Sequence, residues 1–412
     1  MYDVIVVGAR CAGSPTAMLL ARKGYRVLLV DKATFPSDTM SGHFIHSRGV
    51  ACLKRWGLLE QLAATNCPAI TRKTLDFGSF SLVGSEPPSD GVAVQYAPRR
   101  TVIDQILVNA AVEAGAELRE GFTVQKLLMD GERVTGIRGH HAQDEPVTEQ
   151  ATLVIGADGR RSLVAHAVQA PTYHSKPSFT CGYYAYWSGI PIEGAEIYPR
   201  AHRIIFALPT NDGKTLVAIQ WPREEFQAVR RNIAAHFMQT LDEFTPHLAS
   251  RVHEGRQEER FVGTGDIPNF FRKPYGSGWA LVGDAGHFKD PVLAHGMSDA
   301  FQDAERIAEA IDSGLAGRRP LQDALADYEQ RRNEAALPLY EINSQMAMLE
   351  PPPPETQCLL NALRSNPIET SRYIAVLAGS ISPAEFFAPE NIARIISEEA
   401  GGTRVEASSR VQ

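Results

Sequence analysis

The chain begins with YDVIVVGARCAG, residues 2–13, in which an apolar run ends at a loop bounded by two glycines. Residues 14–23 then show helical spacing, Gly24 is placed to end that helix, and a second apolar run over residues 27–30 stops at Asp31. Strand, tight turn, helix and strand in this order predict a βαβ unit. The fold is therefore expected to be α/β and to start with a Rossmann-like unit.

The loop over residues 8–13 has the features of a phosphate-binding turn. Gly8 and Gly13 permit a tight turn and close packing of helix against strand, and free amides at a helix N-terminus attract anions. Asp31 is placed to accept hydrogen bonds from both hydroxyls of an adenosine ribose, and it would repel a 2′-phosphate. Arg10 stands where the usual G-x-G-x-x-G motif has its second glycine, so a strand-turn-helix with incidental glycines remains an alternative.

The composition is that of an ordinary globular protein. A length of 412 residues favours two interlocked lobes, and the hydrophobic content of 44% and charged content of 22% are unremarkable. The net charge of −7 comes without a block of like charges, so we expect no nucleic-acid partner. No apolar run approaches the roughly 18 residues of a membrane helix, so any membrane contact is expected to be peripheral.

The cysteines and the N-terminus bear on the cellular compartment. An odd number of cysteines without a CxxC pair favours free thiols in a reducing cytoplasm over a disulfide scaffold or a metal site. The chain opens directly on a strand without a basic leader, so we expect no secretory signal and a cytoplasmic location. The cysteines are Cys11, Cys52, Cys67, Cys181 and Cys358.

Apolar periodicity divides the rest of the chain into helical and alternating regions. Residues 103–114 have the spacing of an amphipathic helix, and apolar runs on both sides of residues 130–131 predict a hairpin. Aromatic, alternating strands at 173–260 predict an inserted antiparallel sheet, with a second hairpin across residues 211–213. Strand and helix patterns at 279–311 indicate a return to the first lobe. We therefore expect a first lobe in two parts, 1–172 and 261–345, a sheet domain at 173–260, and a helical tail at 346–412.

Two further glycine-flanked carboxylates follow predicted buried strands. The first is GADG at residues 156–159. The second is GDAGH at residues 283–287, which continues through DP at 290–291 to HGM at 295–297. Each motif alone is compatible with a simple turn or hairpin, but the order of dinucleotide loop, Asp-Gly motif and Gly-Asp motif is specific.

Together the three motifs resemble the fingerprint set of the FAD-dependent monooxygenase (aromatic hydroxylase) superfamily, close to its geranylgeranyl reductase-like branch. The resemblance spans about the first 310 residues. It implies a Rossmann-like FAD-binding domain of the glutathione reductase type with a mixed sheet, an inserted antiparallel substrate sheet and a helical C-terminal tail. It also implies that Arg100 and Asp284 contact the FAD pyrophosphate, ribose or ribitol, and that Asp158 serves the nucleotide site. The implied FAD contacts are Gly8, Ala12, Gly13, Asp31, Lys32, Arg100, Asp158, Gly283, Asp284, Pro291, Gly296 and Met297.

Gly296 is expected to open a helix in the third motif. The N-terminal amides of that helix would point at the flavin N1 and C2 carbonyl and stabilise the anionic reduced ring, which would ease flavin reduction.

Candidate catalytic and substrate residues lie outside the three motifs. His43 and His46 are in a loop that the resemblance places near the isoalloxazine, and histidine is the side chain that titrates near neutral pH without perturbation. Tyr184 and Tyr186 share one strand face, while Trp187 faces the other, and these three rings are candidates to wall a substrate cavity. Packing histidines and ordinary sheet packing are the alternatives.

Two flavin chemistries fit the motifs. One forms a flavin hydroperoxide that hydroxylates or epoxidises an apolar, aromatic or polycyclic small molecule, with electrons from NAD(P)H either directly or through a separate flavin reductase. The other delivers hydride to an isoprenoid double bond. We favour the monooxygenase because an aromatic middle sheet suits a flat apolar substrate and no lipid-surface helix stands out.

Three other activities are less favoured. Flavin-dependent halogenases share the scaffold but carry two tryptophans in a W-x-W-x-x-I-P motif, where this chain has Tyr184 and Tyr186. Their lysine-glycine segment is also not recognisable around Lys73. A non-catalytic scaffold like the GDP-dissociation inhibitors would not need the Asp-Gly and Gly-Asp motifs, and an NAD-dependent dehydrogenase would not need the late Gly-Asp motif.

Overall fold

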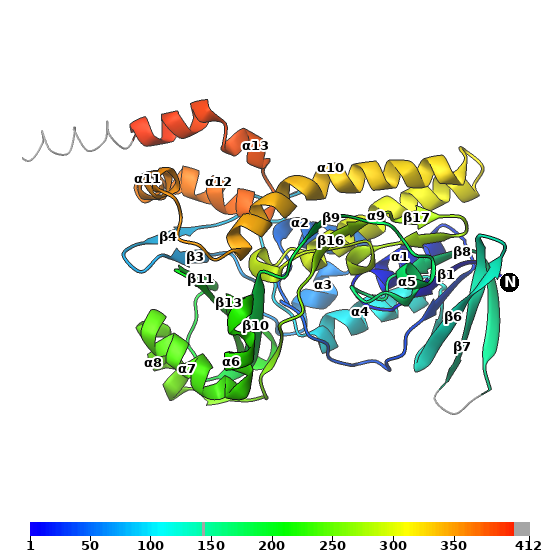
Figure 1. The fold of residues 1–412 in the computed structure, drawn as a ribbon, viewed down its shortest axis with the longest axis horizontal. Coiled ribbons are helices and arrows are strands. Elements are labelled where there is room, and N and C mark those ends of the chain that lie inside the picture. Colours follow the sequence, from blue (N-terminus) through cyan, green and yellow to red (C-terminus); the bar gives the residue numbers. More distant parts are fainter. Residues whose placement is uncertain (142–144, 399–412) are drawn as a thin grey trace, which may run out of the picture.

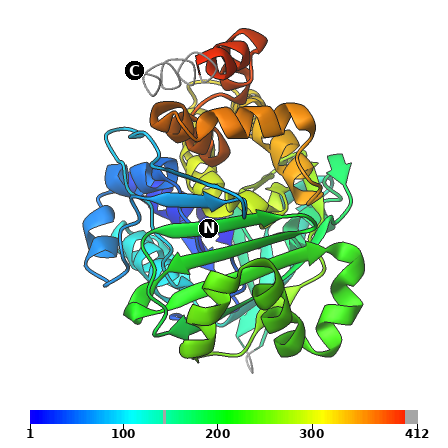
Figure 2. The ribbon, with the colours of Figure 1, turned by 90° about the vertical axis from the view of Figure 1, so that its left-hand side faces the viewer.

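The computed structural model describes residues 1–141 and 145–398. Two eight-stranded sheets form its frame, with helices packed against both (Figure 1). The first sheet contains the N-terminus, and the second, drawn mostly in green, faces the viewer in Figure 2. The architecture is α/β, as the sequence predicts.

The first sheet contains the predicted βαβ unit. β1 lies between β2 and β8 and is parallel to both, with Val6 opposite Leu29 and Ile155. The strand order is β17-β18-β8-β1-β2-β5, and the β6–β7 hairpin predicted around residues 130–131 joins at β8. β18 pairs in parallel with β8, so residues 279–281 lie in the same sheet as β1. The strands are β1 (Tyr2–Val7), β2 (Val27–Val30), β5 (Glu117–Arg119), β6 (Phe122–Asp130), β7 (Arg133–His141), β8 (Val147–Gly156), β17 (Tyr275–Gly276) and β18 (Trp279–Leu281).

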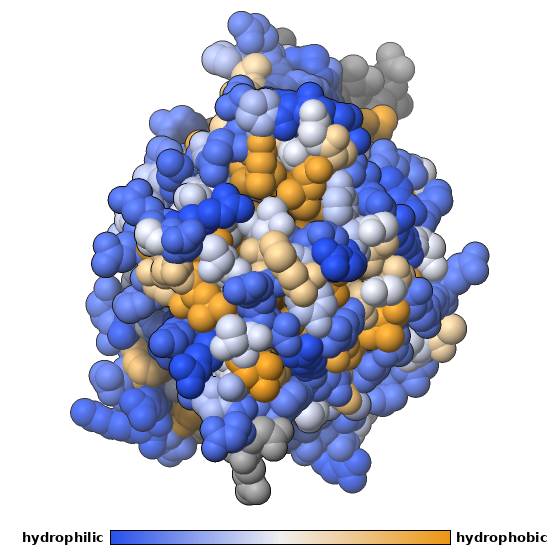
Figure 3. Space-filling view, turned by 90° about the vertical axis from the view of Figure 1, so that its right-hand side faces the viewer, coloured by the Kyte–Doolittle hydropathy of each residue, from blue (hydrophilic) through white to orange (hydrophobic). Residues whose placement is uncertain are grey.

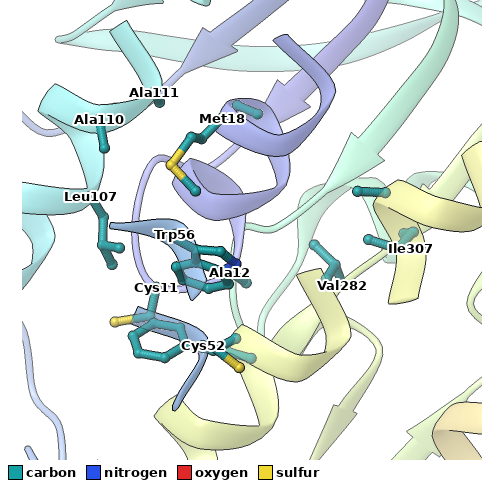
Figure 4. Packing of buried hydrophobic residues seen from close by; sticks show 14 of the residues in the cluster. Cys11, Ala12, Met18, Cys52, Trp56, Leu107, Ala110, Ala111, Val282 and Ile307 are labelled. Atoms are coloured by element: carbon teal, nitrogen blue, oxygen red, sulfur yellow. The ribbon is translucent and has the colours of Figure 1, made fainter. Parts of the chain in front are cut away.

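Helices cover one face of the first sheet and the β6–β7 hairpin covers the other. Because both faces of the central strands are buried, β2 and residues 4–7 of β1 are continuous apolar runs rather than alternating ones. Figure 4 shows Met18, Leu107 and Ile307 converging on this core from three different helices. The helices of this lobe are α1 (Gly13–Arg22), α2 (Ser47–Trp56), α3 (Leu59–Ala63), α4 (Arg100–Glu113), α5 (Leu163–Ala167), α9 (Gly296–Leu315) and α10 (Leu321–Ala347).

The second sheet is the predicted middle sheet with an addition. Its order is β14-β10-β13-β12-β11-β3-β4, with β15 also on β10, and β12 and β13 form the predicted second hairpin. β3 and β4 come from residues 73–84, within the segment expected to belong to the first lobe, and β3 pairs in parallel with β11 while β4 forms the edge. The strands are β3 (Lys73–Asp76), β4 (Ser81–Gly84), β10 (Thr180–Ser188), β11 (Ala195–Arg200), β12 (Arg203–Pro209), β13 (Thr215–Pro222), β14 (Arg256–Gln257) and β15 (Val262–Thr264).

Alternating residues give the second sheet two different faces. Cys181, Val217 and Trp221 are in one core with α6 (Phe226–Arg231), α7 (Ile233–Phe244) and α8 (Pro246–Glu254). The other face is turned toward the first lobe, where it lines a cavity.

The remaining elements connect the two sheets and close one end of the molecule. A small sheet contains β9 (Thr172–Lys176), β16 (Asn269–Arg272) and β19 (His287–Phe288). The tail forms α11 (Pro354–Leu363), α12 (Pro367–Ala378) and α13 (Pro383–Phe386), which pack with Leu75 and Leu82 of β3 and β4. The predicted tail runs on to residue 412, and its residues 399–412 lie outside the described part.

The molecular surface is mainly hydrophilic at the end that carries the N-terminus. Figure 3 shows the apolar residues of that face in small groups separated by hydrophilic ones. Within residues 1–141 and 145–398, no helix combines the length and the apolar character needed to cross a bilayer.

Candidate active site

A cavity of about 690 Å³ lies between the loops of the first lobe and the inner face of the second sheet. It is lined at one end by the loop before α1 and the end of β2, and at the other by β10, β12 and β13. A volume of this size is typical of sites for small ligands. The cavity therefore brings the predicted cofactor motifs and the middle sheet into one site.

The loop before α1 is built as a close backbone cradle. A Cβ on Gly13 would stand 1.7 Å from the carbonyl oxygen of Gly8, and one on Gly8 would stand 2.4 Å from that of Ala157. The N-cap of α1 is Ala12, and no side chain caps the helix. The Ser14 amide donates to the Arg10 carbonyl at 3.0 Å and Pro15 has no amide hydrogen, but among the described residues the Gly13 amide has no backbone acceptor. The Gly13 amide is thus left for an anion such as a pyrophosphate.

Asp31 lines the adjoining part of the cavity at the end of β2, next to Lys32. One carboxylate oxygen accepts a hydrogen bond from the Ala9 amide at 2.7 Å, and the other accepts from the Ala33 amide at 2.8 Å. Each oxygen keeps a further lone pair for a ribose hydroxyl. Asp31 therefore also holds the loop in shape, a role that its position in the sequence did not suggest.

Arg10 departs from the usual glycine pattern without filling the cradle. Its side chain reaches α4, where the guanidinium lies 2.6 Å from the fully buried carboxylate of Asp104. Arg100 binds the same carboxylate at 2.9 Å, and both arginines also line the cavity. Cys11 donates its thiol to Asp104 at 3.3 Å, and burial raises the pKa of that thiol, so it stays protonated. Asp104 was missed by sequence reasoning, although its i,i+4 spacing from Arg100 is a usable signal.

The two later motifs reach the cavity in different ways. The Asp158 carboxylate accepts hydrogen bonds from the Ser162 hydroxyl and, at 2.6 Å, from the Leu163 amide, so it binds the start of α5 as well as lining the cavity. A Cβ on Gly283 would stand 2.7 Å from that of Ala12, which brings the Gly-Asp turn against the cradle. Among the described residues, the Asp284 carboxylate accepts no hydrogen bond from the protein, and burial raises its pKa. Asp284 is therefore available to cofactor hydroxyls.

The start of α9 also opens on the cavity. Gly296, Met297 and Pro291 line it, and no side chain caps this helix. A Cβ on Gly296 would have no heavy atom within 4 Å, so this position borders free space. Cradle, free carboxylate and uncapped helix together fit an extended dinucleotide such as FAD.

A buried ion cluster that sequence reasoning missed lies behind the start of α9. Asp299 binds Lys289 and Arg48, each at 2.6 Å, and both Asp299 and Lys289 line the cavity. The positive charges of Lys289 and Arg48 balance the buried negative charge of Asp299, because a charge is stable in a protein interior only when it is paired. Among the described residues, no group of three or more His, Cys, Asp and Glu side chains is arranged to hold a metal ion.

His43 lies at the cavity, but the reason for predicting it as a proton carrier is wrong. Its Nδ1 lies 2.7 Å from the Ser41 carbonyl oxygen, which can only accept, so Nδ1 donates and Nε2 accepts from the Tyr186 hydroxyl at 2.6 Å. Burial, with the nearby Arg100 charge, lowers the pKa of His43 to about 3. The ring is neutral at physiological pH and both nitrogens are occupied.

His46 requires a larger correction, because it does not line the cavity. Its ring nitrogens lie 3.0 Å from a Glu86 carboxylate oxygen and 2.9 Å from the Leu293 carbonyl oxygen. Glu86 also forms a buried ion pair with Lys73. His46 therefore belongs to a buried network, and a catalytic contact with substrate is excluded by its position.

The three predicted aromatic side chains of β10 separate into three environments. Tyr184 lines the cavity, whereas Tyr186, on the same strand face, is packed beneath it with its hydroxyl on His43. Trp187 lies in the core on the opposite face with α7 and α8, so its prediction as a substrate contact is wrong. The alternation of a β-strand makes this separation necessary.

Asp290 is a buried carboxyl at the cavity that joins the loop before α9 to the second sheet. It accepts hydrogen bonds from the Thr180 hydroxyl at 2.6 Å and from Gln220 Nε2 and the Val292 amide at 3.2 Å. Burial raises its pKa to about 6, although these hydrogen bonds oppose the shift.

The raised pKa of Asp290 predicts a pH-dependent stability. A folded-state pKa above the unfolded value of 3.8 means that the folded protein holds the proton more tightly, so the contribution is complete below pH 4 and is lost as pH rises through about 6. Between pH 4 and 7 the wild type should lose on the order of 3 kcal/mol relative to Asp290→Asn. Urea unfolding of the FAD-loaded proteins measures this, with the exposed Asp130→Asn as control. An identical pH dependence of wild type and Asp290→Asn would contradict the buried carboxyl.

The chain is similar to known sequences over most of its length. The family model described as FAD binding domain matches residues 1–341. The chain is 27% identical over 341 residues to a tryptophan 2-halogenase of Chondromyces crocatus, and the aligned part is 79% of this chain and 64% of that protein. It is 26% identical over 349 residues to a digeranylgeranylglycerophospholipid reductase of Methanocella arvoryzae, and the aligned part is 81% of this chain and 83% of the reductase. It is 28% identical over 385 residues to the rifampicin monooxygenase of Streptomyces venezuelae, and the aligned part is 88% of this chain and 75% of the monooxygenase.

Solved structures confirm the fold. A flavin-dependent brominase superposes with a TM-score of 0.82 over the full length of both chains at 19% identity, which is evidence for the fold alone. The family match covers the cradle, the Asp-Gly turn and the start of α9, the parts of the cavity that fit FAD. The chain therefore belongs to the FAD binding domain family and is an FAD-dependent oxidoreductase of the monooxygenase superfamily.

Proposed function

We propose that this enzyme is a monooxygenase that transfers one atom of O₂ to an apolar, aromatic or polycyclic small molecule. The observation that carries the proposal is that one cavity is lined both by the FAD cradle and by an aromatic and aliphatic sheet face. FAD, when bound and reduced, supplies the activation of oxygen. The sheet face supplies apolar contact area for a flat substrate.

The side chains of this protein would bind the substrate and exclude water. Tyr184, Phe206 and Leu216 present apolar surface to the cavity, and such a surface limits the access of water to the reacting atoms. The Tyr186–His43 hydrogen bond holds the cavity-lining loop at residues 39–44 against this sheet. These residues act by position, and none of them needs to change its protonation state.

We further propose that NAD(P)H is the electron source and that the enzyme works in the cytoplasm. The sequence has one dinucleotide loop, so the nicotinamide would bind transiently in the same cavity or reduce FAD through a separate flavin reductase. The five cysteines are all free in the structure, which supports a reducing compartment.

Two rival activities come from the relatives. The similarity to a digeranylgeranylglycerophospholipid reductase supports reduction of an isoprenoid double bond as the alternative. Halogenation is less favoured, because Lys73 is buried in its ion pair with Glu86 and does not line the cavity. The FAD site, in turn, disfavours a non-catalytic scaffold or a plain NAD-dependent dehydrogenase.

A staged turnover separates these activities. The yellow protein is reduced anaerobically with NADH or NADPH and then given candidate substrates, first without oxygen, then with oxygen, then with oxygen and bromide. We expect product with oxygen alone. Product without oxygen would move the assignment to the reductase, product that needs bromide would move it to a halogenase, and a protein that binds no FAD would overturn the proposal.

Tyr186→Phe should uncouple oxygen consumption from product formation. The change leaves the buried Nε2 of His43 without its donor and loosens the loop that lines the cavity, at a cost of about 1–3 kcal/mol. We expect the ratio of hydrogen peroxide to product to rise about fivefold or more, with FAD content unchanged. Tyr328→Phe is the matched control, because its buried hydroxyl donates to the Leu281 carbonyl away from the cavity. An equal rise in both variants would show a general loss of packing instead.

A further inference from the structure

The cavity face of the second sheet is apolar with few exceptions. Even-numbered residues in the middle of β10, β12 and β13 line the cavity, whereas Val217 and Trp221 of β13 belong to the opposite core. Side chains on this face present rings and aliphatic groups, with one hydroxyl and one amide. We call this face the sheet wall, which consists of Gly182, Tyr184, Phe206, Leu208, Leu216, Ala218 and Gln220.

The amide on the sheet wall, Gln220, is only half satisfied. The side chain is 5% exposed, and its Nε2 donates to Asp290 Oδ1 at 3.2 Å and to Thr180 Oγ1 at 3.4 Å. Its Oε1 is buried and has no hydrogen-bond partner among the described residues. A buried polar atom without a partner is uncommon in folded proteins and points to a ligand that completes it.

The neighbours of Gln220 fix the orientation of its amide. Thr180 donates its hydroxyl hydrogen to Asp290 Oδ2, so its oxygen is left as an acceptor for Gln220 Nε2. Asp290 Oδ1 is also an acceptor and already receives the Val292 amide. A flipped amide would set Oε1 against the Asp290 carboxylate. The network therefore holds Nε2 inward and leaves Oε1 as the free acceptor.

The opposite strand leaves room beside this acceptor. Gly182 pairs with Gln220 across β10 and β13, and a Cβ on Gly182 would lie 3.2 Å from Gln220 Cγ. Any larger residue would press on the amide. Glycine at this position keeps the approach to Gln220 open.

We infer that Gln220 is the specificity-determining anchor of the substrate, and that the substrate is an apolar molecule with one neutral hydrogen-bond donor, a hydroxyl or an N–H, which binds Gln220 Oε1. This inference rests on the proposed function, because it takes the sheet wall to be the substrate half of the cavity. Asp290 and Pro291 are neighbours in the loop that leads to α9, and both line the cavity. A donor bound at Gln220 thus fixes one end of the substrate at the border between the sheet wall and the cofactor half.

The same geometry excludes other substrate classes. A carboxylate would meet the Oε1 acceptor beside the Asp290 carboxylate, and the sheet wall carries no cationic side chain to balance it. A substrate without a donor would displace water and leave Oε1 buried and unpaired. Sites built to hydrogen-bond a substrate group discriminate strongly against analogues that lack it.

Matched ligands test the inference without turnover. Binding of 2-naphthol, 2-methoxynaphthalene and 2-naphthoic acid to the oxidised FAD-loaded protein is measured at pH 8 by calorimetry and by the change in flavin absorbance. We expect 2-naphthol to bind about tenfold more tightly than its methyl ether, the ratio that corresponds to about 1.4 kcal/mol. The acid should bind more weakly than either. This comparison uses the wild type, so it does not depend on the folding of a variant.

A variant then assigns the preference to one side chain. Gln220→Met keeps the length of the side chain and removes the acceptor. It should reduce the ratio of naphthol affinity to ether affinity to about twofold or less, because the hydrogen bond that distinguishes the two ligands is lost. Gln322→Met, on the exposed surface of α10, should keep the wild-type ratio. Equal binding of naphthol and its ether, binding of neither, or an unchanged ratio in Gln220→Met would each overturn the inference.

The outcome is independent of the oxygen chemistry. If turnover yields a product with two added hydrogens and no oxygen, the monooxygenase proposal fails while the donor preference stands. If an oxygenated product forms but naphthol and its ether bind equally well, the monooxygenase proposal stands and the role of Gln220 as anchor is wrong.

Discussion

Asp31→Ala is expected to reduce the FAD content of the purified protein to less than about a tenth of the wild-type value. The change removes the ribose acceptor at the end of β2 and also the two backbone hydrogen bonds to Ala9 and Ala33 that shape the cradle. A charge-assisted hydrogen bond contributes about 1.5–3 kcal/mol, so loss of the ribose contacts alone weakens binding by more than tenfold. Flavin absorbance after desalting and a titration with FAD measure the effect.

Asp3→Ala is the matched control for Asp31→Ala. The Asp3 carboxylate also accepts a hydrogen bond from a backbone amide, that of Arg26 at 2.8 Å, but it does not line the cavity. It should keep its FAD. Full retention of yellow colour in Asp31→Ala would remove Asp31 from the site, and loss of FAD in both variants would indicate damage to the sheet.

Gly296→Val is expected to slow reduction of bound FAD about tenfold or more while leaving most of the FAD in place. The new side chain would enter open cavity space at the uncapped start of α9, where no protein atom lies within 4 Å of the added Cβ. It would separate the helix amides from the flavin and weaken their stabilisation of negative charge on the reduced ring. Anaerobic stopped-flow reduction and the flavin content report the two effects separately.

Two further variants show whether the effect of Gly296→Val is specific to flavin reduction. Ala316→Val places the same β-branched side chain at the exposed far end of α9 and should reduce FAD at the wild-type rate. Asp284→Ala should instead lower FAD content, because the free carboxylate beside the cradle is lost. Equal loss of FAD from Gly296→Val and Asp284→Ala would show that Gly296 serves binding and not reduction.

Local patterns in the sequence were enough for most of the frame. The βαβ unit and the hairpins β6–β7 and β12–β13 depend on residues close in the chain, and their turn signals are strong. The parallel pairing of β3 with β11 was missed, because a pairing between residues 73–75 and 195–197, which lie far apart in the chain, leaves no local pattern. That strand also carries Lys73 into the buried network with Glu86.

The candidate site could be predicted by position more readily than by chemistry. Gly8, Asp31 and Gly296 come together at one cavity because glycine turns and strand ends mark such sites in the sequence. The state of His43 could not be predicted, because its burial and the Tyr186 hydroxyl determine its pKa. The free oxygen of Gln220 likewise depends on partners distant in sequence.

In the proposed reaction, one atom of molecular oxygen reaches a substrate held between FAD and the sheet wall. Turnover under ¹⁸O₂ in ordinary water, followed by mass spectrometry of the product, tests it most directly. We predict one ¹⁸O atom per product molecule, with none when ¹⁶O₂ is supplied in H₂¹⁸O. A product that carries oxygen from water, or that gains two hydrogens and no oxygen, would contradict the account.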